Sequence, residues 1–242
     1  MTHLEGLNQE QLGAIEWFGK KGFTKKGIFI RCEKADATKA ALSKYGGKVP
    51  HLPGEDPYVK TEEGTQLELA VQLYVPELPE NVQRLLPHEL QDALILLFIN
   101  TDETPENGPM PVRIYHKDDI PKLQLADAKE EPHIESAIFK SYEVIDTYND
   151  SGNDFLESME EVDGLVVEEL MNEIRHKRDT NCYFGGFPYF VQGEASPGEG
   201  WTLLLNLQDD SYFSYMFGDA GTAQIWVNDS DPTQFHLEWQ CG

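Results

Sequence analysis

The chain has 242 residues, and its 43 Asp and Glu residues against 19 Lys and Arg residues give a net charge of −24. A negative field of this strength repels phosphate backbones and anionic headgroups, so neither nucleic acid nor a membrane surface is an expected partner. The longest apolar run, 93–99, has seven residues, far fewer than the roughly 20 that cross a bilayer.

The net charge indicates the kind of partner, and the cysteines and the first residues indicate the cellular compartment. The charge serves solubility, or it forms an acidic face for a basic protein or peptide. Cys32, Cys182 and Cys241 form no CxxC pair and leave an odd thiol under any disulfide scheme. The first residues lack a basic start followed by an apolar stretch, so we expect a cytoplasmic protein.

The first expected element is an accessory helix within residues 1–24. Asn8 and Gln11 have the spacing of a capping box, and apolar residues follow at helical spacing until the glycines at 19–22. Residues 35–44 are Ala-rich and predict a short helix-like segment, and Pro87 opens a helical turn within 85–90.

Most of the remaining pattern predicts strands, because apolar residues alternate or form short runs between turn residues. The expected strands are 27–32, 67–75, 93–100, 112–115, 136–145, 203–207 and 223–227.

An acidic connector is expected at residues 151–180. Residues 154–173 contain eight carboxylates and no Lys or Arg, yet apolar residues recur at helical spacing and a basic tetrad closes the segment at 175–178. This pattern favours a solvated helix. An acidic binding tail and a nuclear address are the alternatives.

Two segments of the chain repeat one another. Tyr45-Gly46-Gly47, with Pro50 soon after, returns 139 residues later as Phe184-Gly185-Gly186 with Pro188. Each copy is followed by an apolar run that ends in Asn and an acidic turn, at 97–102 and 225–230. We therefore predict a mainly β (α+β) fold with an internally duplicated β-sheet unit and a few peripheral helices. The halves are 25–150 and 181–242, within one compact body.

The glycines of these motifs have an expected structural role. They lie where the backbone bends or another segment approaches closely. The residues assigned to structural turns are Gly46, Gly47, Pro50, Gly185, Gly186, Pro188, Gly218 and Gly221. Asp219, between the last two glycines, accepts the N–H groups of its own turn or presents a carboxylate to a ligand.

No familiar catalytic signature is present. The sequence has no GxSxG elbow, no phosphate-binding loop and no GxGxxG before a helix pattern. No histidine pair has HxxxH or HxH spacing, and the polar segment 146–154 fails the calcium-loop register at both ends. We therefore expect no catalytic residue, metal or cofactor.

Aromatic residues concentrate at the end of the chain, since 13 of the 26 lie in residues 181–242. They form a β core, or they line a groove for a peptide, and both can hold together. The candidate contact residues are Tyr189, Trp201, Tyr212, Phe213, Asp219 and Trp226.

The chain resembles the YwqG-like family of bacterial proteins of unknown function, which is distantly related to eukaryotic programmed cell death protein two and its ribosome-biogenesis relatives. The resemblance covers about residues 25–242 and rests on an ordered series of motifs. These are Ser43-Lys44-Tyr45-Gly46-Gly47, Phe184-Gly185-Gly186-Phe187-Pro188-Tyr189-Phe190-Val191-Gln192, Leu203-Leu204-Leu205-Asn206-Leu207-Gln208-Asp209-Asp210 and Phe217-Gly218-Asp219-Ala220-Gly221 before Ile225-Trp226-Val227.

The resemblance implies a mainly β fold built from a duplicated unit. Through the eukaryotic relatives it implies the holding of a ribosomal protein during its delivery, which is protein binding and not catalysis. The chain departs from the family pattern by an extra residue before Pro50, by Phe217 in place of Trp, and in the strand at 205–208. The first departure changes the loop that precedes His51.

These observations favour a non-enzymatic module that binds or holds a protein or peptide, with a basic client. One alternative is a hydrolase-like enzyme with a site between the repeats, using Asp219 with His51 or His236 as acid and base. Another is an acidic immunity or stress-associated protein that neutralises a basic toxin.

Overall fold

The computed structural model describes residues 8–149, 182–208 and 213–242. The expected acidic connector at 151–180 lies outside the described residues, so its helix stays a prediction. Within the described part of the chain, no helix combines the length and apolar character that crossing a bilayer requires.

The protein is mainly β, as predicted, with two α-helices among the described residues. The helices are α1 (Gln9–Lys21) and α2 (Glu80–Gln83), with 3-10 turns at Val75–Glu77, His88–Leu90 and Ile120–Lys122. The strands are β1 (Thr24–Lys34), β2 (Lys44–Tyr45), β3 (Val49–His51), β4 (Glu68–Tyr74), β5 (Leu94–Ile99), β6 (Gly108–Pro109), β7 (Val112–Tyr115), β8 (Gln124–Ala126), β9 (Ala137–Tyr148), β10 (Tyr183–Gly185), β11 (Trp201–Gln208), β12 (Thr222–Asn228) and β13 (Phe235–Gln240).

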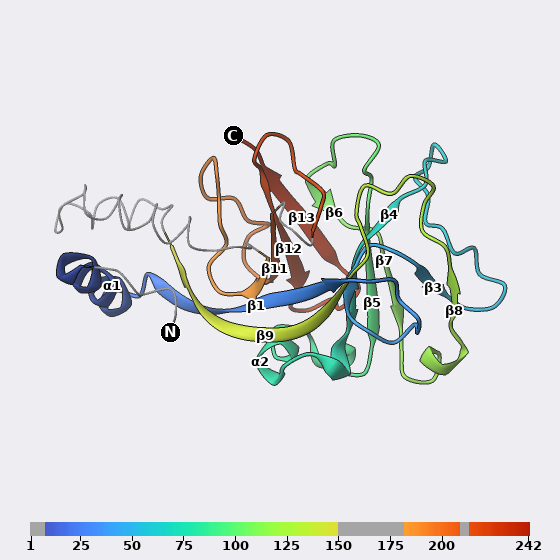
Figure 1. Cartoon of the computed structure of the whole chain (residues 1–242), viewed down its shortest axis with the longest axis horizontal. Helices are drawn as coiled ribbons and strands as arrows, with labels where there is room; N and C mark the ends of the chain where they lie inside the picture. The colour runs from blue at the N-terminus through green and yellow to red at the C-terminus, as the bar shows by residue number, and fades with distance from the viewer. Residues whose placement is uncertain (1–7, 150–181, 209–212) are drawn as a thin grey trace.

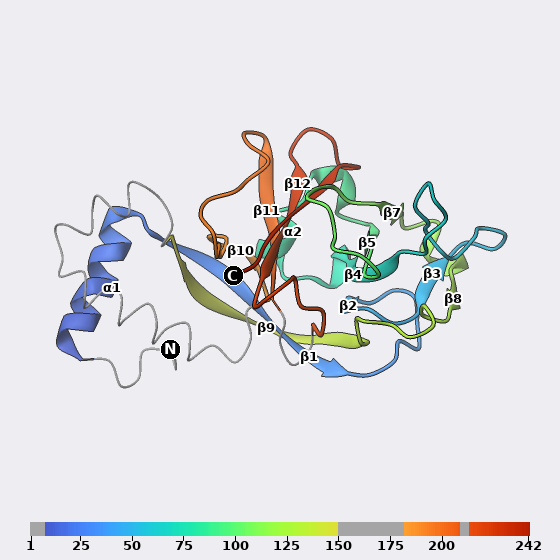
Figure 2. The same cartoon turned by 90° about the horizontal axis from the view of Figure 1, so that it is seen from above.

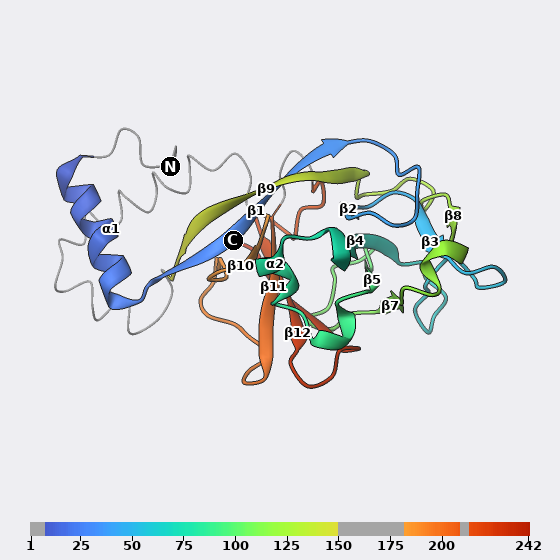
Figure 3. The same cartoon turned by 90° about the horizontal axis from the view of Figure 1, so that it is seen from below.

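The sequence prediction of α1 is confirmed in detail. The Asn8 side chain accepts from the Gln11 backbone, and the Gln11 side chain accepts from the Asn8 backbone, which completes the capping box. Gly22 ends the helix in the left-handed conformation. The helix lies at one end of the molecule, far from β3 and β8 (Figure 3).

One curled sheet of eleven strands forms the body, in the order β6-β13-β12-β11-β10-β1-β9-β2-β4-β5-β7. The long strands β1 and β9 run side by side through its middle (Figures 1 and 2). Outward from β1 come β10, β11, β12 and β13, and outward from β9 come β2, β4, β5 and β7, all antiparallel. On each side of the central pair, four antiparallel strands therefore follow one another outward in chain order.

The registers of the two sides also correspond. Tyr45 pairs with Val71, which pairs with Leu97. In the same way Phe184 pairs with Leu205, and Leu205 pairs with Ile225. Both sides contain a one-residue register shift at the same point.

The shift lies between Leu69 and Val71 in β4 and between Leu203 and Leu205 in β11. Beyond it, Leu69 pairs with Phe98 and Leu203 pairs with Trp226. Phe98 and Trp226 therefore occupy matching positions on the two sides of the sheet.

One short segment joins the two ends of the sheet. β6 pairs with β13, β7 pairs with β5, and only Met110 and Pro111 separate β6 from β7. The Met110 N–H donates to the Phe235 carbonyl at 2.8 Å, and the Phe98 N–H donates to the Pro111 carbonyl at 3.0 Å. The curled sheet thus returns on itself along residues 108–115.

The inner face of the sheet carries one large core. Buried side chains from both predicted halves pack in it, including Tyr45, Leu97, Phe184 and Ile225. Two smaller clusters cover the other face: one under β3 and β8 around Phe98, the other around Trp226.

One expectation from the sequence differs from the structure, and some strands were not predicted. Residues 35–44 contain no helix, because the Gln72 side chain binds the carbonyls of Ala40 and Leu42 and holds this segment as an irregular loop. β13 was not predicted, although Phe235, Leu237 and Trp239 alternate with polar residues there.

Candidate functional site

A pocket lined by aromatic rings lies on the outer face of β11 and β12 and has a volume of about 490 Å³. We call it the aromatic pocket. Its rings come from two adjacent strands and from the loop that follows β10. The lining residues are Lys25, Leu85, Asn149, Gly185, Gly186, Phe187, Pro188, Phe190, Glu194, Ser196, Gly198, Trp201, Thr202, Leu203 and Trp226.

Strand pairing brings the two tryptophans into this pocket. Trp226 on β12 pairs with Leu203 on β11, and Trp201 lies two residues before Leu203, so all three side chains share a face of the sheet. Phe190 packs on Leu203 and Trp226 from the loop, and Trp201 packs against this cluster.

The loop that forms the wall is held by side chains of the sheet. The Tyr189 N–H donates to Asn206 Oδ1 at 3.1 Å, and its carbonyl accepts from Thr222 Oγ1 at 2.8 Å and from Gln224 Nε2 at 2.7 Å. Gln240 Oε1 accepts from two further loop N–H groups, and its Nε2 donates to the Gly193 carbonyl. The pocket is therefore preformed along residues 187–193.

The aromatic pocket combines apolar rings with polar side chains from several segments. Trp226 is 8% exposed, and its indole N–H has no acceptor among the described residues. A buried donor without an acceptor is costly. Lys25 Nζ lies 4.4 Å from the centroid of the Phe187 ring.

The titratable groups of the aromatic pocket are one lysine and one glutamate. The lining residues that the structure describes include no histidine, cysteine or aspartate. They offer flat apolar surfaces and five polar side chains, Lys25, Asn149, Glu194, Ser196 and Thr202.

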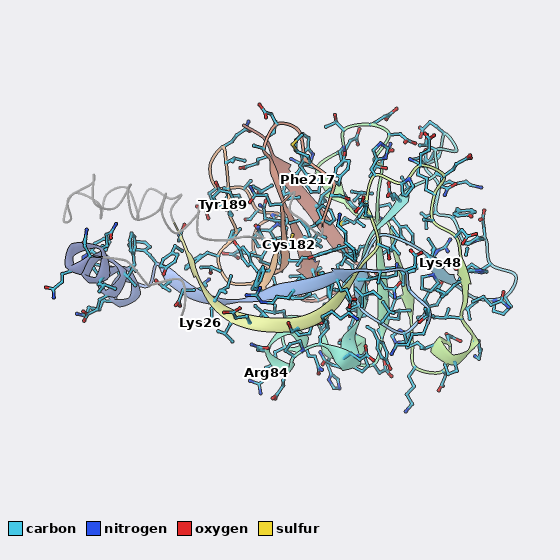
Figure 4. All side chains as sticks on the ribbon, viewed as in Figure 1. Lys26, Lys48, Arg84, Cys182, Tyr189 and Phe217 are labelled. Atoms are coloured by element: carbon cyan, nitrogen blue, oxygen red, sulfur yellow. The ribbon has the colours of Figure 1, made fainter. Side chains whose placement is uncertain are left out.

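The candidate contact residues lie in different places. Trp201 and Trp226 line the aromatic pocket, and Tyr189 lies on its loop beside β11 and β12 (Figure 4). Phe213 is fully buried in the main core, where its ring centroid is 5.2 Å from that of Tyr45. Tyr212 lies outside the described residues. The aromatic residues of the last quarter therefore supply both core and pocket.

The expected acid–base residues are not brought together. Asp219 is in the exposed turn after Phe217, where its carbonyl accepts from the Gly242 N–H, and Gly221 packs closely on backbone carbonyls. His236 pairs with Trp226 near the other end of β13, and its Nε2 contacts Glu238 at 2.8 Å. His51 lies on β3, in the separate two-stranded sheet.

The two Gly-Gly turns have similar positive φ angles. Gly46 and Gly47 have φ of 48° and 71°, and Gly185 and Gly186 have φ of 60° and 74°. Close contacts accompany them, because a Cβ on Gly46 would lie 2.3 Å from the Ile134 carbonyl oxygen. Pro50 follows the first turn in β3, and Pro188 follows the second in the aromatic pocket.

Comparison with known protein families finds one match. A domain of unknown function, DUF1963, matches residues 43–241, which is most of the chain. The protein belongs to the DUF1963 family. No curated protein matches the sequence. The DUF1963 match contains both Gly-Gly turns and every described lining residue of the aromatic pocket except Lys25.

Sequence reasoning missed part of this candidate site. Phe187 and Phe190 belonged to the repeated motif but were not proposed as contacts, and Lys25 carried no signal because strand β9 and the loop reach it from distant segments. Within the described residues, no group of three or more His, Cys, Asp or Glu side chains is placed to hold a metal ion.

Proposed function

We propose that this protein is a non-enzymatic module that binds an extended segment of a basic protein or peptide, with the aromatic pocket as its anchor site. The observation that carries the proposal is the preformed pocket around Trp201 and Trp226, whose wall is held by side chains of the sheet. An apolar or aromatic client side chain fills such a pocket.

The charge of the chain supports a basic client. At −24, the field favours encounter with positively charged segments and disfavours acidic ones. The resemblance to the YwqG-like family, and through it to programmed cell death protein two, supports the same client-holding role. The matching strand orders support its origin from an internally duplicated unit.

Peptide selection tests this proposal. A phage library of random dodecapeptides is panned on the wild type, on Trp201→Ala and on Trp17→Ala, and the selected peptides are titrated by fluorescence anisotropy. We expect selected peptides to combine an apolar or aromatic residue with Lys or Arg. We expect Trp201→Ala to weaken them about tenfold.

Trp17→Ala is the matched control, because it removes a half-buried tryptophan on α1, which lines neither pocket. Selected peptides that bind Trp201→Ala as tightly as the wild type would contradict the proposal, as would a library that yields no enrichment.

A further inference from the structure

A second pocket lies where the curled sheet returns on itself, and it has a volume of about 510 Å³. We call it the acidic pocket. Apolar side chains and prolines form its floor, and four glutamates belong to its lining. The floor consists of Val59, Leu67, Phe98, Ile99, Pro105, Pro109, Met110, Pro111 and Leu237, and the glutamates are Glu62, Glu63, Glu103 and Glu106.

The acidic pocket matches the aromatic pocket in the symmetry of the sheet. Phe98 in one and Trp226 in the other follow the same register shift, and Asn100 and Asn228 then form the same turn. Asn100 Oδ1 accepts from the Asp102 N–H at 3.2 Å, and Asn228 Oδ1 accepts from the Ser230 N–H at 2.9 Å. The two pockets share no lining residue.

The walls of the acidic pocket are held in place. Trp239 Nε1 donates to the Pro105 carbonyl at 2.6 Å, and the Trp239 N–H donates to Asn107 Oδ1 at 2.9 Å. On the other side, the Thr61 and Thr65 backbones bond to each other, and Thr61 Oγ1 accepts from the Thr65 N–H. These bonds fix the segments that carry the glutamates.

The charges in the acidic pocket are unbalanced. None of its four glutamates forms a hydrogen bond or an ion pair with another described residue. Lys60 is the one basic residue among the described lining, and its Nζ already contacts Asp56 Oδ2 at 3.2 Å. An apolar floor with an uncompensated acidic rim is complementary to an aliphatic chain that ends in a positive charge.

We propose that the acidic pocket binds a lysine or arginine side chain of a basic polypeptide. The methylene stem packs on the more exposed apolar lining at Val59, Pro109 and Pro111, and the charged head meets the glutamates of the rim. This inference rests on the proposed peptide-binding function for its partner class, but it uses a separate pocket. It predicts that a basic side chain of the client binds in the acidic pocket.

A fluorescein-labelled oligolysine peptide tests the proposal by anisotropy at low and physiological salt. The four glutamates of the pocket are changed to glutamine together. The matched control removes the same charge from exposed positions that line neither pocket: Glu33→Gln, Glu89→Gln, Asp118→Asn and Glu199→Gln. We expect the pocket variant to bind about tenfold more weakly, and the control to change by less than about threefold.

A second arm uses the wild type alone and examines the floor. An oligomer of diaminobutyric acid has the same length and charge as oligolysine but a shorter stem, so it buries less apolar surface. We expect it to bind more weakly than oligolysine. Equal loss in the pocket and control variants would overturn the inference, and so would equal binding of the two oligomers.

Trp201→Ala separates this inference from the proposed function. We expect it to bind oligolysine like the wild type, because Trp201 does not line the acidic pocket. The role of the aromatic pocket is tested by the peptide selection and not by oligolysine. A loss of oligolysine binding in Trp201→Ala would place the cation at the aromatic pocket and overturn the inference.

Discussion

Lys44 is a charged residue that lies fully inside the protein. Its side chain is 0% exposed, and Nζ donates to the Gly46 carbonyl. It lies beside Gln72 across the β2–β4 pair, under the loop at 35–43. Burial lowers the pKa of Lys44 to about 7, and the charge of Asp36 offsets part of this effect.

The lowered pKa predicts how stability depends on pH. Between about 7 and the ordinary Lys pKa of 10.5, the unfolded chain holds a proton that the folded chain has lost, so the free energy of unfolding rises with pH. Below pH 7 both states are protonated, and the cost of the buried charge is complete and constant. The contribution of Lys44 is at most about 1.4 kcal/mol per pH unit.

We expect Lys44→Met to remove this slope. The difference in unfolding free energy between variant and wild type should then fall as pH rises from 7 to 9, as measured by urea denaturation. Lys117→Met, at an exposed lysine, controls for the loss of one positive charge in an acidic protein. Parallel curves for Lys44→Met and wild type would show that Lys44 is not the titrating group.

The Gly-Gly turns give a second prediction at this scale. Gly54 has φ of 85°, and no atom lies within 4 Å of the place that a Cβ would take there, whereas a Cβ on Gly46 would meet the Ile134 carbonyl. Gly54→Ala should therefore cost only the left-handed backbone strain of about 1–2 kcal/mol. Gly46→Ala should cost more than about twice as much, because a backbone carbonyl must also move. Equal melting temperatures for the two variants would contradict this expectation.

At the scale of elements, strong local patterns were predictive. The capping box predicted α1, and short apolar runs predicted β1, β4, β5, β7, β9, β11 and β12. The loop at 35–44 was predicted wrongly as helix-like because its conformation depends on Gln72, which is 30 residues away in sequence from the Leu42 carbonyl it binds. The helix propensity of the local sequence does not take such a long-range contact into account.

The candidate site was predictable to the same extent. Trp201 and Trp226 were named from the sequence, and adjacent strands bring them together. Phe213, a core residue, could not be separated from the pocket residues, because burial depends on which face of a strand or loop meets the sheet. The acidic pocket needed the return of segment 108–115 to β13, a long-range pairing without a local signal.

The loop of the aromatic pocket depends on Gln240. Its amide accepts from the N–H groups of Val191 and Gln192 and donates to the Gly193 carbonyl at 2.8 Å. Gln240→Ala removes all three bonds at a half-buried position of β13, so we expect faster amide exchange in residues 189–195 and little change in β12. Unchanged exchange in this loop would show that other contacts hold it.

At the scale of the whole molecule, the two sides of the sheet share a framework and differ in what they expose. The matched positions Phe98 and Trp226 lie in pockets of different chemistry, one acidic and one aromatic. The strand order and registers therefore account for the scaffold, and the divergence between the sides locates the proposed binding functions. Both sides nevertheless pack into one core, so their stabilities should be coupled.

A shared core predicts that the two sides unfold together. Leu97 and Ile225 occupy matching positions, are both fully buried and belong to the same cluster. Leu97→Ala should destabilise the protein by about 2–5 kcal/mol. Under native-state hydrogen exchange, this loss should appear equally in the slowest amides of β5 and β12, because one cooperative unit opens. Ile225→Ala should likewise lower the protection of the slowest amides equally in β12 and β5. If each substitution lowered protection only on its own side, the two sides would be separate folding units joined at β1 and β9.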